Sequence, residues 1–369
     1  MSFSALGISE NYIKALKELK IIKPSPIQEE AIPFLLTNGT DFIAQAPTGT
    51  GKTAAYGLPL LARIDPKSPK VQALILTPTR ELGQQVAKQL FKFTKYTDKI
   101  FTEAVYGGAK IEQQIAALRR PTQIIVATPG RLIDLLQKKA LDLDTVKTII
   151  LDEADEMLSM GFKKELTRIL KQATAKHDTW LFSATMPPEI KTIIKEYMKP
   201  TAHRVTIGTD KVNKKIKHQF IVIDQSEKLN MLLHFLRQMG NDRGMIFCRT
   251  KASAKSLVEE LKAKGLSAEA IHGDLLQKER DKIMRAFKKE TLQFLIATDI
   301  AARGIDVKDL AFVAHYEQPD QVEYYVHRSG RTARAGQEGL SLSFVTKDEL
   351  KQLNYLQDKL KIVIEKVRI

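Results

Sequence analysis

The chain has 369 residues and a mass of 41.6 kDa, which is long for one ordinary domain and comfortable for two. Its formal net charge of +15 favours a polyanionic partner, either nucleic acid or an anionic membrane surface, although solvated lysines alone would also explain it. The single cysteine, Cys248, excludes an internal disulfide and a cysteine-based zinc site, and its apolar neighbours predict a buried thiol. No apolar run approaches a membrane span and the first residues lack a secretory pattern, so we expect a cytoplasmic protein.

The first half of the chain alternates short apolar runs with amphipathic stretches. The amphipathic stretch 81–96 has the period of a helix. The apolar runs are nearly continuous, as expected for parallel strands that are covered on both faces. This alternation predicts a doubly wound α/β domain over residues 1–207. The predicted strands are 41–46, 71–77, 123–128, 148–153 and 180–185.

The second half repeats the pattern over residues 216–369, after a polar stretch at 208–215 that we interpret as a linker. One helix is expected to end on Gly265, a typical C-terminal glycine, and Asp320 with Glu323 is expected to cap another. A last amphipathic helix is expected to pack on this second domain. The predicted strands are 216–224, 244–249, 268–273, 293–299 and 340–345, and the predicted helices include 251–265 and 347–361.

The run 41–46 leads directly into the segment PTGTGKT and then into a helical stretch. Strand, glycine-rich loop and helix are the context of a phosphate-binding loop, in which backbone N–H groups surround phosphate oxygens. Lys52 would reach the β- and γ-phosphates, and the Thr53 hydroxyl would bind Mg²⁺. The alternative is a flexible glycine turn, which the flanking strand and helix disfavour. The predicted loop residues are Ala46 (where the usual pattern has glycine), Thr48, Gly49, Thr50, Gly51, Lys52 and Thr53.

A second motif, DEAD at 152–155, follows the apolar run that begins at residue 148. Asp152 is placed to hold Mg²⁺ through water, and Glu153 can orient or deprotonate an attacking water. The alternative interpretation is an acidic helix N-terminus, where carboxylates are favourable in any case. The phosphate loop earlier in the chain favours the catalytic interpretation.

These motifs belong to an ordered series that resembles the DEAD-box ATP-dependent RNA helicases, in the form of a bacterial-type minimal core. The resemblance covers essentially the whole chain. It implies two RecA-like domains in tandem, each a mostly parallel sheet with helices on both faces. The other motifs are PTREL (78–82), the glycine pair 107–108, TPGR (128–131), SAT (183–185), ATDIAARGID (297–306) and HRSGRTAR (327–334).

The segment KPSPIQ (23–28) is similar to the adenine-recognition motif of this family. The Gln28 amide has both donors and an acceptor, so it can pair with the N6 and N7 edge of adenine. The resemblance implies that Phe3 stacks on the base, the alternative being a core residue. Lys20 stands where the family has glycine. In the second domain, Gly304 and Asp306 would face the nucleotide, with Asp306 hydrogen-bonding a ribose hydroxyl.

The resemblance also implies RNA contacts after several strands. Hydroxyls, backbone N–H groups and guanidinium groups grip phosphates without reading bases, so little sequence specificity is expected. For each arginine the alternative is an ordinary surface charge. The implied RNA-binding residues are Thr79, Arg80, Gly108, Thr128, Gly130, Arg131, Arg249, Arg280 and Thr298.

Three arginines recur at every third position of HRSGRTARAG (327–336), a spacing that on a helix would place them on one face. A solvated basic face is the alternative. The resemblance implies that Arg331 and Arg334 are arginine fingers for the γ-phosphate. Two departures from the family pattern are Ser329, usually apolar, and Ala333, usually glycine. The residues implied to couple the two domains are Asp155, Ser183, Thr185, His327 and Arg328.

We therefore predict an RNA-dependent ATPase that uses ATP and Mg²⁺ to unwind short RNA duplexes or remodel RNA–protein complexes. The principal alternative is an ATP-gated RNA clamp with little unwinding. A DNA helicase or translocase and a non-catalytic nucleic-acid-binding module are further alternatives, disfavoured by the DEAD motif and by intact Lys52, Asp152 and Glu153. The expected partner is RNA, with no membrane association and a monomeric core.

Overall fold

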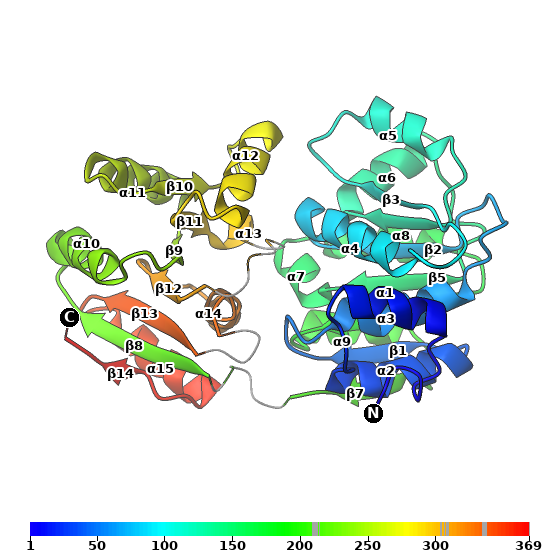
Figure 1. Cartoon of the computed structure of the whole chain (residues 1–369), viewed down its shortest axis with the longest axis horizontal. Helices are drawn as coiled ribbons and strands as arrows, with labels where there is room; N and C mark the ends of the chain where they lie inside the picture. Colours follow the sequence, from blue (N-terminus) through cyan, green and yellow to red (C-terminus); the bar gives the residue numbers. More distant parts are fainter. Residues whose placement is uncertain are drawn as a thin grey trace. The chain divides into compact units, whose positions relative to one another are not determined.

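The computed structural model describes residues 1–208, 213, 215–302, 305, 307, 310–333 and 338–368. The chain divides into two compact units, Met1–Thr209 and Asp210–Ile369, each built on its own sheet (Figure 1). Most of the predicted linker, 208–215, lies outside the described residues. Within the described parts of the chain, no helix combines the length and apolarity needed to cross a membrane.

The sheet of the first unit has seven described strands in the order β3-β4-β2-β5-β6-β1-β7, and every neighbouring pair is parallel. The strands are β1 (Phe42–Gln45), β2 (Ala73–Leu76), β3 (Thr102–Val105), β4 (Ile124–Ala127), β5 (Thr148–Asp152), β6 (Asp178–Ser183) and β7 (His203–Thr206).

The five strands predicted for this unit are confirmed, although β6 begins and ends two residues before the predicted range. Strands β3 and β7 were not predicted. Both are edge strands, and most of their residues are half-buried or exposed, so they need no continuous apolar run. The central strands are buried along nearly their whole length, which explains why their apolar pattern was recognisable.

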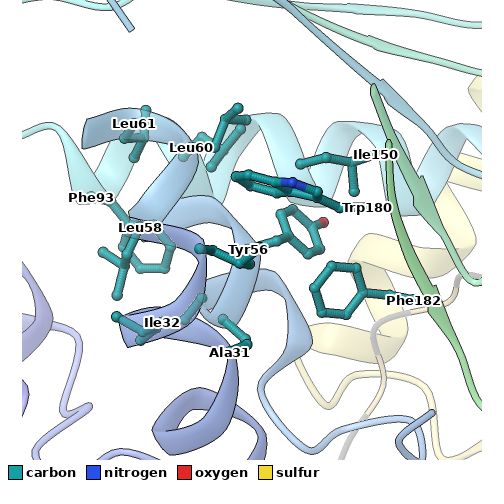
Figure 2. Close-up of a cluster of buried hydrophobic side chains, with 14 of the residues drawn as sticks. Ala31, Ile32, Tyr56, Leu58, Leu60, Leu61, Phe93, Ile150, Trp180 and Phe182 are labelled. Carbon is teal, nitrogen blue, oxygen red and sulfur yellow. The ribbon is translucent and has the colours of Figure 1, made fainter. Parts of the chain in front are cut away.

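Helices cover both faces of this sheet, as predicted. The helices α1 to α4 bury one face in a cluster that includes Tyr56, Trp180 and Phe182 (Figure 2). The helices α6, α8 and α9 contribute to a second cluster on the other face, around Ile149 and Leu151. The helices are α1 (Glu10–Glu18), α2 (Pro26–Thr37), α3 (Lys52–Arg63), α4 (Arg80–Phe93), α5 (Ile111–Leu118), α6 (Pro129–Gln137), α7 (Ala154–Ser159), α8 (Lys163–Gln172) and α9 (Pro188–Tyr197).

The second unit has a sheet of the same kind, with described strands in the order β10-β11-β9-β12-β13-β8-β14, all in parallel pairs. Strands β12 and β14 were not predicted: β14 has only two residues, both exposed, whereas β12 is a fully buried strand of four residues that the sequence analysis missed. The strands are β8 (Ile216–Val222), β9 (Gly244–Cys248), β10 (Ala268–Ile271), β11 (Phe294–Thr298), β12 (Phe312–His315), β13 (Gly339–Val345) and β14 (Glu365–Lys366).

The predicted cap by Asp320 and Glu323 is wrong. The N-cap residue of α14 is Gln321, which makes no side-chain cap hydrogen bond, and Asp320 instead pairs with Arg249 at 3.5 Å. The expected end of α11 is confirmed, because Gly265 has φ 77° and its N–H bonds the Lys262 carbonyl. The helices are α10 (Lys228–Gln238), α11 (Lys251–Ala263), α12 (Gln277–Lys288), α13 (Asp299–Ala302), α14 (Val322–Ser329) and α15 (Leu350–Leu360).

The predicted packing of the last helix is confirmed. Helix α15 buries Leu353, Leu356 and Leu360 in a cluster with Ile216 and Val345, which belong to the two neighbouring strands β8 and β13. The helix therefore closes one face of the second sheet at the edge opposite to β10.

Two residues that replace an expected glycine have left-handed backbones. Lys20 has φ 59° just after α1, and Ala333 has φ 56° in the arginine motif. The turn after α1 forms as a glycine would form it, because the N–H groups of Lys20 and Ile21 bond the carbonyls of Lys17 and Leu16. Both residues thus keep the left-handed backbone conformation that suits glycine, and their side chains make that conformation sterically unfavourable.

Candidate functional site

The predicted site segments of the first unit lie at one edge of its sheet. Because every strand pair is parallel, the carboxyl ends of all strands meet there. The neighbouring strands β5, β6 and β1 end in the DEAD motif, the SAT motif and the phosphate loop. The neighbouring strands β3, β4 and β2 end in the three segments predicted to bind RNA. The segments predicted to bind the nucleotide and those predicted to bind RNA thus occupy adjacent halves of one edge.

The phosphate loop joins β1 to α3, and two glycines have left-handed backbones there. Gly49 has φ 79° and Gly51 has φ 92° at the N-cap of α3. A Cβ at Gly51 would lie 2.3 Å from the Gln28 Nε2 atom. Glycine is therefore required at residue 51 both by the backbone and by the close side chain. The N–H groups at the start of α3 are available at the loop, as anion binding requires.

Lys52 is held across the loop. Its side chain is buried, and its Nζ donates to the Ala46 carbonyl at 3.1 Å. Ala46, where the usual motif has glycine, is itself fully buried and donates its N–H to the Ser183 carbonyl at 2.9 Å. The Thr50 hydroxyl bonds the Pro47 carbonyl at 2.8 Å. These contacts fix the ammonium beside the loop before any phosphate binds. Thr48 and Thr53 are half-buried in the same segment.

The Gln28 amide connects helix α2 to the phosphate loop. Its Oε1 accepts the Ser25 N–H at 3.0 Å, and its Nε2 donates to the Gly51 carbonyl at 3.0 Å. Phe3 is 3% exposed and packs in the core cluster of this face, as the core interpretation held. The Phe3 ring has almost no exposed surface on which a base could stack, and its stacking on adenine stays a prediction.

Asp152 is buried at the end of β5 and accepts a hydrogen bond on each oxygen. The Glu153 N–H reaches Oδ1 at 3.0 Å, and the Tyr56 hydroxyl reaches Oδ2 at 2.8 Å. Burial raises the pKa of Asp152, while the charge of Lys52 and the bond from Tyr56 oppose that rise. Glu153 has φ 50°, a left-handed conformation that is common at functional sites.

Asp155 ties the DEAD motif to the SAT motif. Its Oδ2 accepts the N–H and the hydroxyl of Thr185, both at 2.8 Å. Its own N–H donates to the Ser183 hydroxyl at 3.2 Å, and that hydroxyl donates to the Thr185 carbonyl at 2.7 Å. Three of the five residues predicted to couple the domains thus form one hydrogen-bonded ring inside the first unit.

Arg80 and Gly108 lie against each other in the predicted RNA half. Gly108 has φ 84°, and a Cβ there would lie 2.7 Å from the Arg80 Nη1 atom. This Nη1 is buried and has no hydrogen-bond partner among the described residues, so an anion would satisfy it. Thr79 caps α4, because its hydroxyl accepts the Leu82 N–H at 3.3 Å.

Arg131 has a nearly buried side chain that hydrogen-bonds within the first unit. Its Nη1 donates to Gln114 Oε1 at 2.9 Å and its Nη2 to the Ala109 carbonyl at 3.0 Å, next to Gly108. Thr128 is the N-cap of α6, and its N–H bonds the Val105 carbonyl at 3.0 Å, joining the β4 and β3 ends. A Cβ at Gly130 would meet nothing within 4 Å.

The second unit places its predicted RNA residues unequally. Arg249 follows β9 with a half-exposed side chain, and Thr298 ends the neighbouring strand β11. Arg280 is buried on α12, where its Nη2 donates to the Ala301 carbonyl at 2.7 Å. Of the two arginines, Arg249 is the one that presents its charge to solvent. The predicted RNA contacts of all three stay predictions.

Arg328 is buried and paired inside the second unit. Its Nε and Nη2 donate to the two carboxylate oxygens of Asp299 at 2.6 and 2.7 Å, and its Nη1 donates to the Glu317 carbonyl at 2.7 Å. The same nitrogen lies 3.4 Å from the His315 Nδ1 atom. The fork geometry matches a bidentate arginine–carboxylate pair.

The expectation that the three arginines share one helix face is wrong, because α14 ends at Ser329. Arg331 lies in the following turn, and its Nη1 donates to the Ile305 carbonyl at 2.7 Å. A cavity of about 10 Å³ brings His327 and Arg331 together with Arg328 and Asp299. The predicted site residues Gly304, Asp306 and Arg334 lie outside the described residues.

The residues present fit a nucleotide with Mg²⁺. Backbone N–H groups and Lys52 suit phosphates, while the Thr53 hydroxyl and the Asp152 carboxylate are oxygen ligands of the kind Mg²⁺ prefers. No group of three or more His, Cys, Asp or Glu side chains that could hold a metal occurs in the part of the chain that the structure describes.

Two residues of the site escaped the sequence analysis. Tyr56 reaches Asp152 from α3, and Asp299 pairs with Arg328. The signal for Tyr56 was its position three residues after Thr53, which puts both on one helix face. The signal for Asp299 was a carboxylate directly after the β11 strand.

Two family models match the chain. The DEAD/DEAH box helicase family matches residues 25–193, and the helicase conserved C-terminal domain matches residues 227–336. The ATP-dependent RNA helicase CshA of Limosilactobacillus reuteri is 43% identical over 359 residues, which cover 97% of this chain and 71% of the relative. The CshA of Listeria monocytogenes is 42% identical, over 97% of this chain and 69% of the relative.

Solved structures of DEAD-box proteins match this chain over nearly its whole length. The Saccharomyces cerevisiae protein Dbp5 bound to RNA and ADP BeF3 is 32% identical, with a TM-score of 0.91 over 99% of this chain and 95% of that chain. A DEAD box protein from Methanococcus jannaschii is 39% identical, with a TM-score of 0.58 over 100% and 99% of the two chains. The two parallel-sheet units are thus RecA-like domains in tandem, and the chain is an ATP-hydrolysing member of the DEAD-box ATP-dependent RNA helicase family.

Proposed function

We propose that this enzyme is an RNA-dependent ATPase that locally unwinds short RNA duplexes or remodels RNA–protein complexes. The observation that carries the proposal is the shared edge of the first sheet. There the ends of β1, β6 and β5 carry the phosphate loop, the SAT motif and the acid motif, and the ends of β2, β4 and β3 carry the segments proposed to bind RNA. An edge that serves both ligands gives RNA a direct route to influence ATP hydrolysis.

In the nucleotide half, the N–H groups at the start of α3 and the Lys52 ammonium bind the phosphates of ATP. Gln28 selects adenine. Glu153 orients the attacking water and takes its proton. Thr53 and Asp152 would hold Mg²⁺, which when bound neutralises charge on the phosphate oxygens. The burial of Lys52 and Asp152 supports these roles, because electrostatic interactions are stronger away from water.

In the RNA half, the unsatisfied Nη1 of Arg80 supports a phosphate contact. Gly108 permits that approach, since any side chain there would displace the guanidinium. Contacts of this kind read the backbone, so RNAs of equal length and structure should bind similarly. Affinity should fall with salt, with a log–log slope of about −0.7 per neutralised phosphate on a single strand.

The two domains, proposed as 1–207 and 216–369 around the linker 208–215, close on ATP and RNA. Closure brings Arg331, and with it Arg334, to the γ-phosphate. A positioned arginine of this kind is typically worth about 10³–10⁵ in rate. We therefore expect Arg331→Ala to abolish most RNA-stimulated ATP hydrolysis while ATP binding persists. Near-normal turnover in that variant would return the arginine cluster to an ordinary basic surface.

The deciding experiment measures ATP hydrolysis by the purified chain alone, with RNA, and with DNA of equal length. Stimulation by RNA and not by DNA is expected, and strand displacement on a short duplex should accompany it. Stimulation without displacement would favour the ATP-gated clamp. No turnover with Mg²⁺ and RNA would overturn the proposal. A Glu153→Gln variant, which keeps size and polarity but removes the base, serves as the inactive control. Magnesium, a monomeric state and a cytoplasmic location stay predictions.

A further inference from the structure

Tyr56 is a fully buried tyrosine on the helix that follows the phosphate loop. Its ring lies beside Trp180 and Phe182 in the core cluster of the first unit (Figure 2). The centroids of the Tyr56 and Phe182 rings are 5.1 Å apart, with the ring planes inclined at 57°. The hydroxyl is a polar atom within an apolar cluster, so its hydrogen-bond partner is decisive for its energetics.

That partner is the carboxylate of Asp152. The distance from the Tyr56 hydroxyl to Asp152 Oδ2 is 2.8 Å, although the two residues are 96 positions apart in sequence. Burial, followed by the charge of Asp152, raises the pKa of Tyr56 well above its usual value, so the phenol keeps its proton and donates it. Since the Glu153 N–H occupies Oδ1, each carboxylate oxygen accepts one fixed donor. Two such donors fix the rotation of the carboxylate plane.

The same helix carries the other residue that would hold the metal. Thr53 and Tyr56 are three positions apart on α3, which places them on one helix face. Helix α3 therefore presents the Thr53 hydroxyl and, one turn later, the hydroxyl that orients the Asp152 carboxylate at the end of β5. Tyr56 links the phosphate-loop helix to the acid motif through a single bond.

We propose that Tyr56 is a positioning residue for the Mg²⁺ centre: its hydroxyl holds Asp152 in the orientation that, together with Thr53, accepts the hydrated metal. This inference rests on the proposed roles of Asp152 and Thr53. The competing explanation is a core tyrosine that uses Asp152 to satisfy its own hydroxyl. The two differ in what the loss of the hydroxyl changes, because a purely structural tyrosine affects stability without affecting the Mg²⁺ requirement.

The test replaces the hydroxyl and keeps the ring, in Tyr56→Phe of the full chain. ADP binding is measured by titration calorimetry in EDTA and across a series of Mg²⁺ concentrations, and the half-saturating Mg²⁺ for ATP hydrolysis is measured in parallel. We expect the affinity for ADP in EDTA to be unchanged. We expect the half-saturating Mg²⁺ concentration to rise about 10-fold, because losing a residue that orients a metal ligand typically lowers metal affinity by about 10- to 100-fold.

Tyr12→Phe is the matched control. Tyr12 is also buried in the core cluster of the first unit, and its hydroxyl interacts with Thr97 away from the acid motif. It should leave the Mg²⁺ dependence unchanged. A Tyr56→Phe change made in an Asp152→Asn background should add nothing further to the Mg²⁺ dependence of ADP binding, because the group that Tyr56 orients is already altered.

Two results would overturn the proposal. One is an unchanged half-saturating Mg²⁺ in folded Tyr56→Phe, with thermal unfolding used to verify folding. The other is an equal loss of ADP affinity with and without Mg²⁺, which would assign Tyr56 to the shape of the loop. Since Mg²⁺-dependent ADP binding requires no RNA, the outcome is independent of whether RNA stimulates hydrolysis. A failure of the proposed RNA-dependent activity would therefore be distinguishable from a failure of this inference.

Discussion

The buried pair of Arg328 and Asp299 leads to the sharpest prediction about the arginine motif. The side chain of Asp299 is 14% exposed, and that of Arg328, in the HRSGRTAR motif, is only 1% exposed. Its guanidinium donates to three acceptors, two of them on Asp299. Arg328→Lys keeps the positive charge and replaces the planar fork with one ammonium, which cannot reach both carboxylate oxygens in parallel.

The expected cost follows from those bonds. A hydrogen bond to a charged group contributes about 1.5–3 kcal/mol, and breaking a buried pair outright costs about 3–5 kcal/mol. Because lysine retains the charge and one bond, we expect Arg328→Lys to lower the free energy of unfolding by about 3 kcal/mol. The matched control is Arg249→Lys. Arg249 pairs with Asp320 at 3.5 Å in an exposed contact, which should contribute less than about 1 kcal/mol to the free energy of unfolding.

Urea unfolding can separate the two units. The single tryptophan, Trp180, is buried in the first unit and reports on that unit by fluorescence, while circular dichroism reports on the whole chain. We expect Arg328→Lys to shift the dichroism transition and to leave the fluorescence transition unchanged. A double-mutant cycle with Asp299→Asn should give a coupling of at least 1 kcal/mol. Wild-type stability for Arg328→Lys, or a coupling near zero, would refute the reasoning.

Three further predictions concern His218, a buried residue of β8 whose Nδ1 lies 2.8 Å from the Tyr325 hydroxyl, and the left-handed residues Lys20 and Ala333. Burial lowers the pKa of His218 to about 4, so its contribution to stability is present above the unfolded pKa of about 6.5 and falls by about 2 kcal/mol as the pH drops to 5. His218→Gln should flatten that part of the profile of unfolding free energy against pH, and an unchanged slope would contradict the assignment. Lys20→Gly should stabilise the chain by about 0.5–1 kcal/mol because Lys20 has φ 59°, whereas Lys17→Gly inside α1 should destabilise it by about 1 kcal/mol. Ala333→Gly should likewise raise the unfolding temperature, because Ala333 has φ 56°; a lower unfolding temperature would show that the buried methyl group outweighs the backbone strain.

The sequence by itself determined the elements whose signal is local. The segment from β1 through the phosphate loop to α3 is contiguous, so the apolar run, the glycines and the helical pattern specify it without reference to the rest of the chain. The central strands of the first sheet were recognisable because both of their faces are buried, which demands a continuous apolar run. The order of the motifs along the chain was enough to identify the family.

The tertiary structure decided which residues meet. Strand β6 lies between β1 and β5, which places the SAT hydroxyls against Asp155 and brings Tyr56 to Asp152 across 96 residues of sequence. The structure also placed Phe3 in the core, which was one of its two interpretations from the sequence, and Arg328 in a buried pair with Asp299 that the sequence did not indicate. The physical reason is common to these cases: residue type and spacing record the local backbone and the need for burial, whereas hydrogen-bond partners depend on strand order and helix packing, which bring together segments far apart in the chain.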